Sequence, residues 1–112
     1  MSTLTTPINK LTGSIPKELG LLTSIQMLYL YANELSGTIP SSFSNTSTLI
    51  ELEISTNNLT GSTPQELGLL TSIEKLYLYA NELLGTIPTS LSNISTLIDL
   101  EISTNKLTES IP

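Results

Sequence analysis

The sequence predicts an α/β repeat solenoid in which every coil adds one strand to a parallel sheet. Three observations support this prediction. Asparagine recurs at positions 9, 33, 57, 81 and 105, proline recurs at 16, 40, 64, 88 and 112, and the apolar positions between them keep one spacing. A fixed period of this length is typical of stacked repeats that share a continuous core. The 112 residues are therefore interpreted as one domain, 1–112, of nearly five repeats.

The main strand of each repeat is predicted from alternating apolar residues. In the second repeat, Leu28 and Leu30 flank Tyr29, and Tyr31 follows. Side chains alternate between the two faces of a strand, so the leucines face the core and the tyrosines face outward. One such strand per repeat builds a parallel sheet.

An asparagine follows each main strand. Its side-chain amide both donates and accepts hydrogen bonds, so a buried stack of asparagines can satisfy backbone groups in the turns of neighbouring coils. We therefore expect a structural rather than a ligand-binding role for this ladder. Its members are Asn9, Asn33, Asn57, Asn81 and Asn105.

The rest of each repeat has a shorter apolar alternation and then predicts a helical turn. The pattern Leu35-x-Gly37-x-Ile39-Pro40 repeats the alternation over a shorter span. Pro16 and its equivalents suit the first position of a helical turn, and Gly20 or Gly68 can end that turn. This part of each repeat should therefore consist of a single helical turn.

The whole frame, LxxLxxLxLxxNxLxGxIPxxLGx, resembles the plant-type subclass of leucine-rich repeat over nearly the entire chain. The resemblance implies a right-handed coil with a concave parallel sheet, short second strands and a convex side of helical turns. It also implies a non-enzymatic recognition module, as in the ectodomains of receptor-like kinases and receptor-like proteins and in polygalacturonase inhibitors. The parent protein is accordingly expected outside the cell or at its surface, although the chain has no paired-cysteine caps and no recognisable signal peptide.

Composition limits the function classes. The net charge is −6, with no arginine and four lysines, so the basic footprint of a nucleic-acid-binding protein is missing. No stretch approaches the about 18 apolar residues of a membrane-spanning helix. Histidine and cysteine are absent, which leaves few ways to pair a nucleophile with a base. We predict no enzyme activity, no cofactor and no metal site.

A longer period lies on top of the first, because residues 10–57 and 58–105 are identical at 38 of 48 positions. Outward residues therefore alternate from coil to coil, and tyrosine rows interleave with acidic rows on the concave face. Tyrosine is favoured at contact surfaces, so this face is predicted to bind a protein or peptide partner. The alternative is a solvated face on which the tyrosine hydroxyls only contact neighbouring carboxylates. The predicted contact residues are Tyr29, Tyr31, Glu51, Glu53, Tyr77, Tyr79, Asp99 and Glu101.

An alternative function uses the second strands. Their outward positions carry hydroxyl residues in two ranks, expected about 4.8 Å apart between coils, and such ranks resemble the ice-binding faces of unrelated solenoids. Leu84 interrupts one rank. The residues are Thr12, Ser14, Ser36, Thr38, Thr60, Ser62, Thr86, Thr108 and Ser110.

Two further features are predicted from short patterns. Asn45, Asn58 and Asn93 match the N-glycosylation acceptor pattern, which matters only in a eukaryotic secretory pathway. Asn58 should be the least accessible of the three because it adjoins the ladder residue Asn57. Apolar columns without caps at both ends make end-to-end self-association through strand edges plausible.

Overall fold

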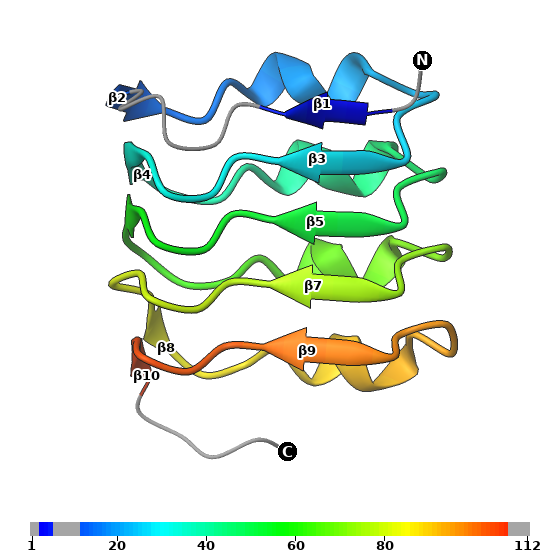
Figure 1. Cartoon of the computed structure of the whole chain (residues 1–112). Helices are drawn as coiled ribbons and strands as arrows, with labels where there is room; N and C mark the ends of the chain where they lie inside the picture. Colours follow the sequence, from blue (N-terminus) through cyan, green and yellow to red (C-terminus); the bar gives the residue numbers. More distant parts are fainter. Residues whose placement is uncertain (1–2, 6–11, 108–112) are drawn as a thin grey trace.

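The main sheet has five parallel strands, one from each coil. The computed structural model of the protein describes residues 3–5 and 12–107, and Figure 1 shows the coils stacked along one axis. Leu4 lies beside Leu28, Leu28 beside Leu52, and Leu52 beside Leu76, so the predicted apolar columns are confirmed. The strands are β1 (Thr3–Thr5), β3 (Met27–Tyr29), β5 (Glu51–Glu53), β7 (Lys75–Tyr77) and β9 (Asp99–Glu101).

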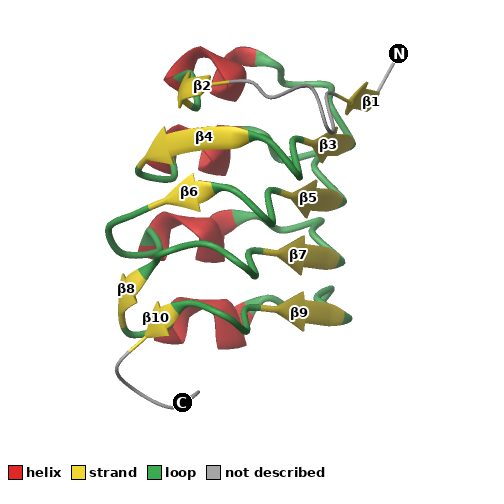
Figure 2. Cartoon of the chain, turned by 60° about the vertical axis from the view of Figure 1, so that its left-hand side comes forward, coloured by secondary structure: helices red, strands yellow, loops and turns green. Residues whose placement is uncertain are grey.

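Shorter strands form a second wall beside the main sheet (Figure 2). They make one three-stranded and one two-stranded parallel sheet, which are linked by an isolated bridge between Ser62 and Leu84. The second strands expected from the sequence are thus confirmed. They are β2 (Thr12–Ser14), β4 (Glu34–Gly37), β6 (Asn58–Leu59), β8 (Leu84–Gly85) and β10 (Lys106–Leu107).

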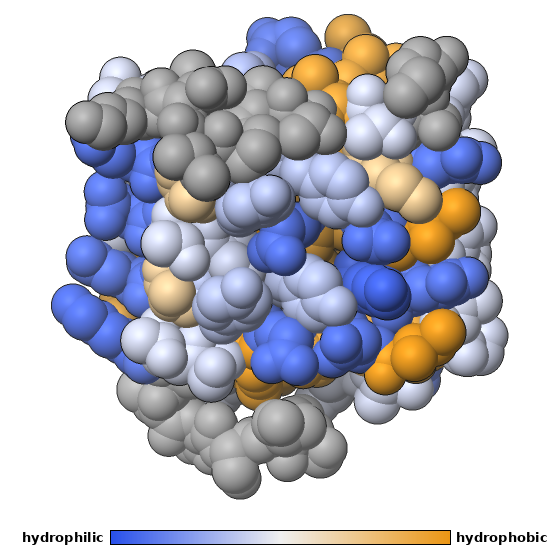
Figure 3. All heavy atoms as spheres, in the orientation of Figure 1, coloured by the Kyte–Doolittle hydropathy of each residue, from blue (hydrophilic) through white to orange (hydrophobic). Residues whose placement is uncertain are grey.

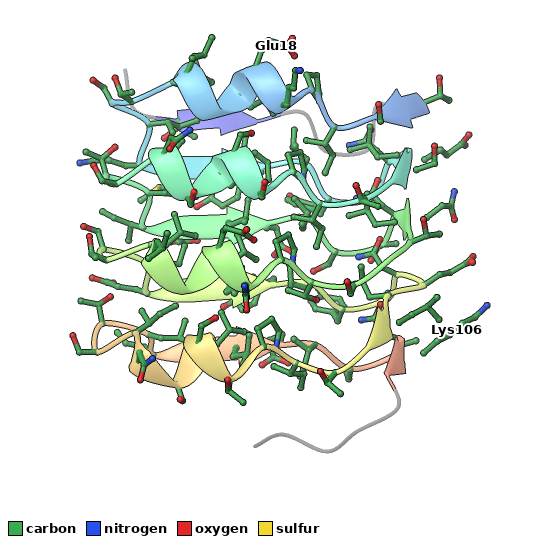
Figure 4. The ribbon with its side chains drawn as sticks, turned by 180° about the vertical axis from the view of Figure 1, so that it is seen from behind. Glu18 and Lys106 are labelled. Carbon is green, nitrogen blue, oxygen red and sulfur yellow. The ribbon has the colours of Figure 1, made fainter. Side chains whose placement is uncertain are left out.

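Short 3-10 helices cover the side opposite the main sheet, as the view from behind shows (Figure 4). Pro16 and its equivalents stand at the N-cap, one residue earlier than predicted. Gly20 and Gly68 do not end the helices, because the C-caps are Leu22 and Leu70. The helices are η1 (Lys17–Leu21), η2 (Ser41–Asn45), η3 (Gln65–Leu69) and η4 (Thr89–Asn93).

Gly20 has a different role from the predicted one, since it allows neighbouring coils to approach closely. A Cβ atom added there would lie 2.5 Å from the carbonyl oxygen of Ser42 in the next coil. The Ser42 hydroxyl in turn donates a hydrogen bond to the Lys17 carbonyl oxygen over 2.7 Å. In the second copy of the duplicated pair, Gly68 and Ser90 repeat this close approach. The close approach therefore recurs once in each copy of the duplicated pair.

The core runs continuously through the coils between the sheets and the helices. Leu52, Leu76 and Phe43 are fully buried, and each coil adds its own residues to the same apolar cluster. Burial of apolar surface of this kind contributes about 25 cal/mol per Å². The core fixes both sheets, so the outward side chains of the main sheet are held on a rigid base.

The asparagine ladder is confirmed at the described positions. The Asn57 side chain donates to the carbonyl oxygens of Leu30, Ile54 and Ser55 over 3.0 to 3.1 Å, and its Oδ1 atom accepts from the Leu35 N–H over 3.1 Å. Leu30 and Leu35 belong to the preceding coil, so one buried amide joins two coils. Asn81 and Asn105 repeat these bonds, Asn33 binds the Leu30 and Tyr31 carbonyls, and Asn9 lies outside the described residues.

Candidate functional site: the outward face of the main sheet

The outward side chains of the main sheet form one mixed surface, which we call the sheet face. Figure 3 views the molecule from this side and shows mostly hydrophilic residues, with hydrophobic ones toward the edge where the strands begin. Ile98, which directly precedes β9, is 75% exposed. The sheet face comprises Met27, Tyr29, Tyr31, Glu51, Glu53, Lys75, Tyr77, Tyr79, Asp99 and Glu101, so it brings together all the predicted contact residues.

Two tyrosines are fixed by carboxylates of the following coil. The Tyr29 hydroxyl donates to Glu51 over 2.9 Å, and the Tyr77 hydroxyl donates to Asp99 over 2.9 Å. Burial, then the bond to Glu51 and its charge, raises the pKa of Tyr29 to about 12. The bond to Asp99, followed by desolvation and nearby negative charge, raises the pKa of Tyr77 to about 12. The alternative prediction of tyrosine–carboxylate contacts therefore describes these two hydroxyl groups correctly.

We expect Tyr29 and Tyr77 to ionise near pH 12, above the ordinary tyrosine pKa of about 10. Because the folded state holds these protons more tightly, their contribution to stability is complete below pH 10 and is lost as the pH rises toward 12. Absorbance at about 295 nm, which reports tyrosinate, measures this directly. Tyr29→Phe and Tyr77→Phe should each remove one tyrosine from the high-pH transition. If either substitution instead removed a tyrosine that ionises near pH 10, the hydrogen-bonded arrangement would be contradicted.

Glu53 lies between these two fixed tyrosines. Its neighbours in register are Tyr29 on one side and Tyr77 on the other. Burial raises the pKa of the Glu53 carboxyl, with a smaller increase from the charge of Glu51, whereas hydrogen bonding from the side chain and backbone of Ser55 lowers it. The Oε1 atom of Glu53 is screened from solvent and has no hydrogen-bond partner among the described residues. The polar groups that face this carboxylate are therefore the side chain and backbone of Ser55.

Ser55 follows Glu53 by two residues, where strand alternation predicts an outward side chain, yet it is 0% exposed. The hydrogen bonds from Ala32 to the Ser55 carbonyl and from Thr56 to the Tyr79 carbonyl continue the strand register past β5. Ser55 therefore sits between the longer side chains of Tyr31 and Tyr79. Its hydroxyl oxygen is buried, and its side chain faces the Glu53 carboxylate. Sequence reasoning missed this site, although the small residue between two tyrosine positions was its visible signal.

The remaining charges of the sheet face are mostly negative. Glu101 lies beside Tyr77 in register, and a hydrogen bond shared with Asp99, together with the charge of Asp99, raises the pKa of the Glu101 carboxyl. Lys75 is the one cation among the described residues of the face, and it lies between Glu51 and Asp99 in register. Within the described ranges, the acids form no group of three or more that could hold a metal ion. The face therefore carries more negative than positive groups.

The second strands do not align their hydroxyl residues as predicted. Ser36 lies beside Ser14 and Asn58 rather than beside Thr12 and Thr60. Residues that pair in these strands are therefore separated by less than one repeat in the sequence. Glu34 lies beside Thr12, and Leu84 beside Ser62 and Lys106, which interrupts both ranks. Lys106 extends from this wall in Figure 4 and pairs with Glu82 over 3.7 Å. The expected lateral spacing of about 4.8 Å between equivalent hydroxyls is therefore wrong.

The individual hydroxyl residues of the second wall are nevertheless exposed. These are Thr12, Ser14, Ser36, Thr38, Thr60, Ser62 and Thr86, while Thr108 and Ser110 lie outside the described residues. The surface beside them is grooved. One groove runs between coils along Thr38, Pro40, Ser42 and Ser62, and a second follows Ser62, Pro64, Thr86 and Pro88. A regular flat lattice of hydroxyls is thus not what this wall presents.

The three glycosylation patterns lie at exposed asparagines. Asn45 and Asn93 are the last residues of η2 and η4, and Asn58 is the first residue of β6. All three side chains are exposed, so the lower accessibility of Asn58 stays a prediction. The equivalent positions in the alternate coils are Leu21 and Leu69, which are 76% and 63% exposed.

The fold defines a class of protein: a parallel-sheet solenoid with a largely polar outward sheet face. Leucine rich repeat is the family whose pattern matches, over residues 23–83. The chain belongs to the leucine-rich repeat family, and its coil is of the right-handed plant type. A search of the curated proteins finds no match. None of the helices in the described ranges has the length and apolar character needed to cross a membrane.

Solved structures from plants are closely similar. A chain of the BIR3–SERK2 complex from Arabidopsis thaliana is 38% identical with a TM-score of 0.93, over 97% of this chain and 58% of that one. The ectodomain of the Arabidopsis thaliana receptor kinase GASSHO1/SCHENGEN3, in complex with CASPARIAN STRIP INTEGRITY FACTOR 2, is 40% identical with a TM-score of 0.97. The match covers 99% of this chain and 13% of that one. The plant peptide hormone receptor RGFR1 in complex with RGF2 is 35% identical with a TM-score of 0.93, and the match covers 96% of this chain and 17% of that one. The chain thus spans less than two thirds of each of these structures.

Proposed function

We propose that the sheet face binds a protein or peptide partner without catalysing a reaction. The similar structures named above include receptors in complex with CASPARIAN STRIP INTEGRITY FACTOR 2 and with RGF2, which supports binding as the general role. The acidic character of the face favours a partner that carries positive charge or many hydrogen-bond donors.

The observation that carries this proposal is the pre-ordered tyrosine array. The bonds from Tyr29 to Glu51 and from Tyr77 to Asp99 hold two rings on a sheet that the core already fixes. Tyr77 and Tyr79 also pack against each other, with ring centroids 6.4 Å apart. Side chains that are ordered before binding lose little entropy on binding, so their apolar surface contributes more fully to affinity.

The test is a selection of peptide ligands on the whole chain. Random peptides of about 12 residues, long enough to cross several strands about 4.8 Å apart, would be displayed and selected against the immobilised protein. For the selected peptides, we expect Tyr77→Ala to weaken binding at least about tenfold, as is usual when an aromatic anchor is removed. Circular dichroism should show an unchanged fold.

Thr86→Ala provides the matched control because Thr86 belongs to the same repeat as Tyr77 but lies exposed on the second wall. It should leave the affinity of the selected peptides unchanged. Equal binding by the Tyr77→Ala protein and the unaltered chain, or a selective loss in the Thr86→Ala protein, would move the binding surface away from the sheet face.

A further inference from the structure

A groove beside the second wall occurs twice in the molecule, because the chain contains a duplicated pair of repeats. Residues 62–66 and 85–89 line the copy that we call the wide groove, with a cavity of about 670 Å³. Residues 14–18, with Thr38 and Pro40, line the equivalent narrow groove, with a cavity of about 380 Å³. Both lie between the short second strands and the 3-10 helices, on the side seen in Figure 4. One chain thus presents two versions of the same groove.

Thr63 lies at the floor of the wide groove, in a column that isoleucine fills elsewhere. Its equivalents Ile15, Ile39 and Ile87 belong to the buried core, and Ile15 is its counterpart in the narrow groove. Thr63 is only 8% exposed, and its side chain forms no hydrogen bond within the described part of the chain. Because Thr63 is among the residues that line the wide groove, the small surface that it leaves exposed opens into that groove. The wide groove therefore has an unpaired hydroxyl where the narrow groove has a hydrocarbon side chain.

An unpaired hydroxyl in a largely buried position destabilises a fold relative to a hydrocarbon side chain of similar shape. The chain itself contains the more stable alternative, since isoleucine fills this column in the coils on either side of Thr63. Positions that break a local packing rule in this way are expected mainly at functional sites. Thr63 thus marks the wide groove, and not the narrow one, as the candidate ligand site.

The other lining residues set the chemistry of the ligand. Gln65 replaces Lys17 of the narrow groove, so an amide that both donates and accepts hydrogen bonds stands where the other copy has a fixed positive charge. Glu66 is the one charged residue among the described residues that line the wide groove. The rings of Pro64 and Pro88 add apolar surface. The wide groove thus combines neutral hydrogen-bonding groups with small apolar surfaces.

We propose that the wide groove binds a neutral sugar, and that the Thr63 hydroxyl is the contact that selects it. Every hydroxyl of a sugar both donates and accepts hydrogen bonds, so it can pair with the Thr63 hydroxyl and the Gln65 amide in either direction. The Glu66 carboxylate accepts further bonds from sugar hydroxyls, and the proline rings contact the C–H groups of the sugar ring. This site is separate from the sheet face, and its ligand belongs to a different class.

Other classes of ligand fit the wide groove less well. An acidic ligand would find no cation among the described lining residues and would meet Glu66. Proline-rich peptides are bound by aromatic side chains, and the described residues that line this groove include none. A metal ion would find the single carboxylate of Glu66, and the described ranges contain no cluster of acids that could hold one.

The experiment is a nuclear magnetic resonance titration of the isotope-labelled full chain with the neutral disaccharides cellobiose, maltose and mannobiose. With at least one of them, we expect saturating shifts at the amides of Thr63, Gln65 and Glu66, and none at the amides of the narrow groove. Sorbitol, an open-chain polyol, is the control for general solvation and should give only small shifts that rise linearly. The proposal is overturned if sorbitol also saturates, if both grooves shift equally, or if no disaccharide saturates.

Thr63→Val is the sharpest variant because it keeps the shape of the side chain and removes only the hydroxyl. It should weaken disaccharide binding about tenfold, since one sugar hydroxyl then loses its partner. The midpoint of urea unfolding should stay the same or rise, because valine suits this apolar column. Thr60→Val, in the same coil but outside the groove, should leave the affinity unchanged. Unchanged affinity of the Thr63→Val chain, or a lower unfolding midpoint, would show that the hydroxyl does not serve a sugar.

The sugar site and the sheet face can fail separately. Thr63→Val should leave the affinity of the selected peptides unchanged, and Tyr77→Ala should leave disaccharide binding unchanged. Loss of disaccharide binding in the Tyr77→Ala chain would place the sugar on the sheet face and overturn the groove as its site.

Discussion

Replacing Asn57 with alanine is expected to lower the free energy of unfolding by about 3 kcal/mol. The substitution removes four hydrogen bonds from a residue that is 7% exposed. It also leaves the Leu35 N–H and the Leu30 carbonyl of the preceding coil without their side-chain partner. Natural domains are stable by only about 5–15 kcal/mol, so a loss of this size is a large share of the total.

Urea unfolding followed by circular dichroism would measure this effect. The adjacent residue supplies the control, because Asn58 is exposed and its side chain makes no hydrogen bond within the described part of the chain. Asn58→Ala should change the free energy of unfolding by less than about 0.5 kcal/mol. Similar effects of the two substitutions would mean that the ladder does not hold the coils together.

The second large effect is expected for Gly61→Ala, with a loss of about 2 kcal/mol. Gly61 has a φ angle of +75°, which disfavours any residue with a Cβ atom. A Cβ atom would also lie 2.8 Å from the Cγ2 atom of Thr38 in the preceding coil, so the threonine must move. Backbone strain and side-chain contact therefore act in the same direction.

A comparison with Gly85→Ala separates these two causes. Gly85 has nearly the same φ angle, +77°. The nearest atom to a Cβ added there is the Cβ atom of Ser62, which is 3.7 Å away. Gly85→Ala should therefore show the strain alone. Thr38→Ser removes the crowding methyl group, so it should recover part of the Gly61→Ala loss in a double-mutant cycle of thermal unfolding. A purely additive cycle would exclude the contact with Thr38.

The main sheet and the ladder could be predicted from the sequence because both repeat at the full period. Leu28 and Leu52 are buried in register, and Asn57 and Asn81 bond to the coil before them, as the regular spacing implies. The outward direction of Tyr29 and Tyr77 followed from simple alternation along a strand. These features depend only on local geometry that every repeat shares.

Other features depend on how one coil lies on the next, which spacing alone does not determine. The second wall pairs Ser36 with Asn58, not with Thr60, because its strands slip relative to the main sheet. Gly20 serves the approach of Ser42 rather than the end of a helix. Ser55 is fully buried, and only three-dimensional packing shows that its side chain faces the Glu53 carboxylate.

The central claim, that the outward face of the main sheet is the binding surface, is tested most directly by locating a bound peptide. A selected peptide carrying a nitroxide spin label would be added to the isotope-labelled chain, and the broadening of each backbone amide signal measured. We predict the strongest broadening at β5 and β7, over Glu51–Glu53 and Lys75–Tyr77. Strongest broadening along the groove between Thr38 and Ser62, or over the 3-10 helices, would contradict the account.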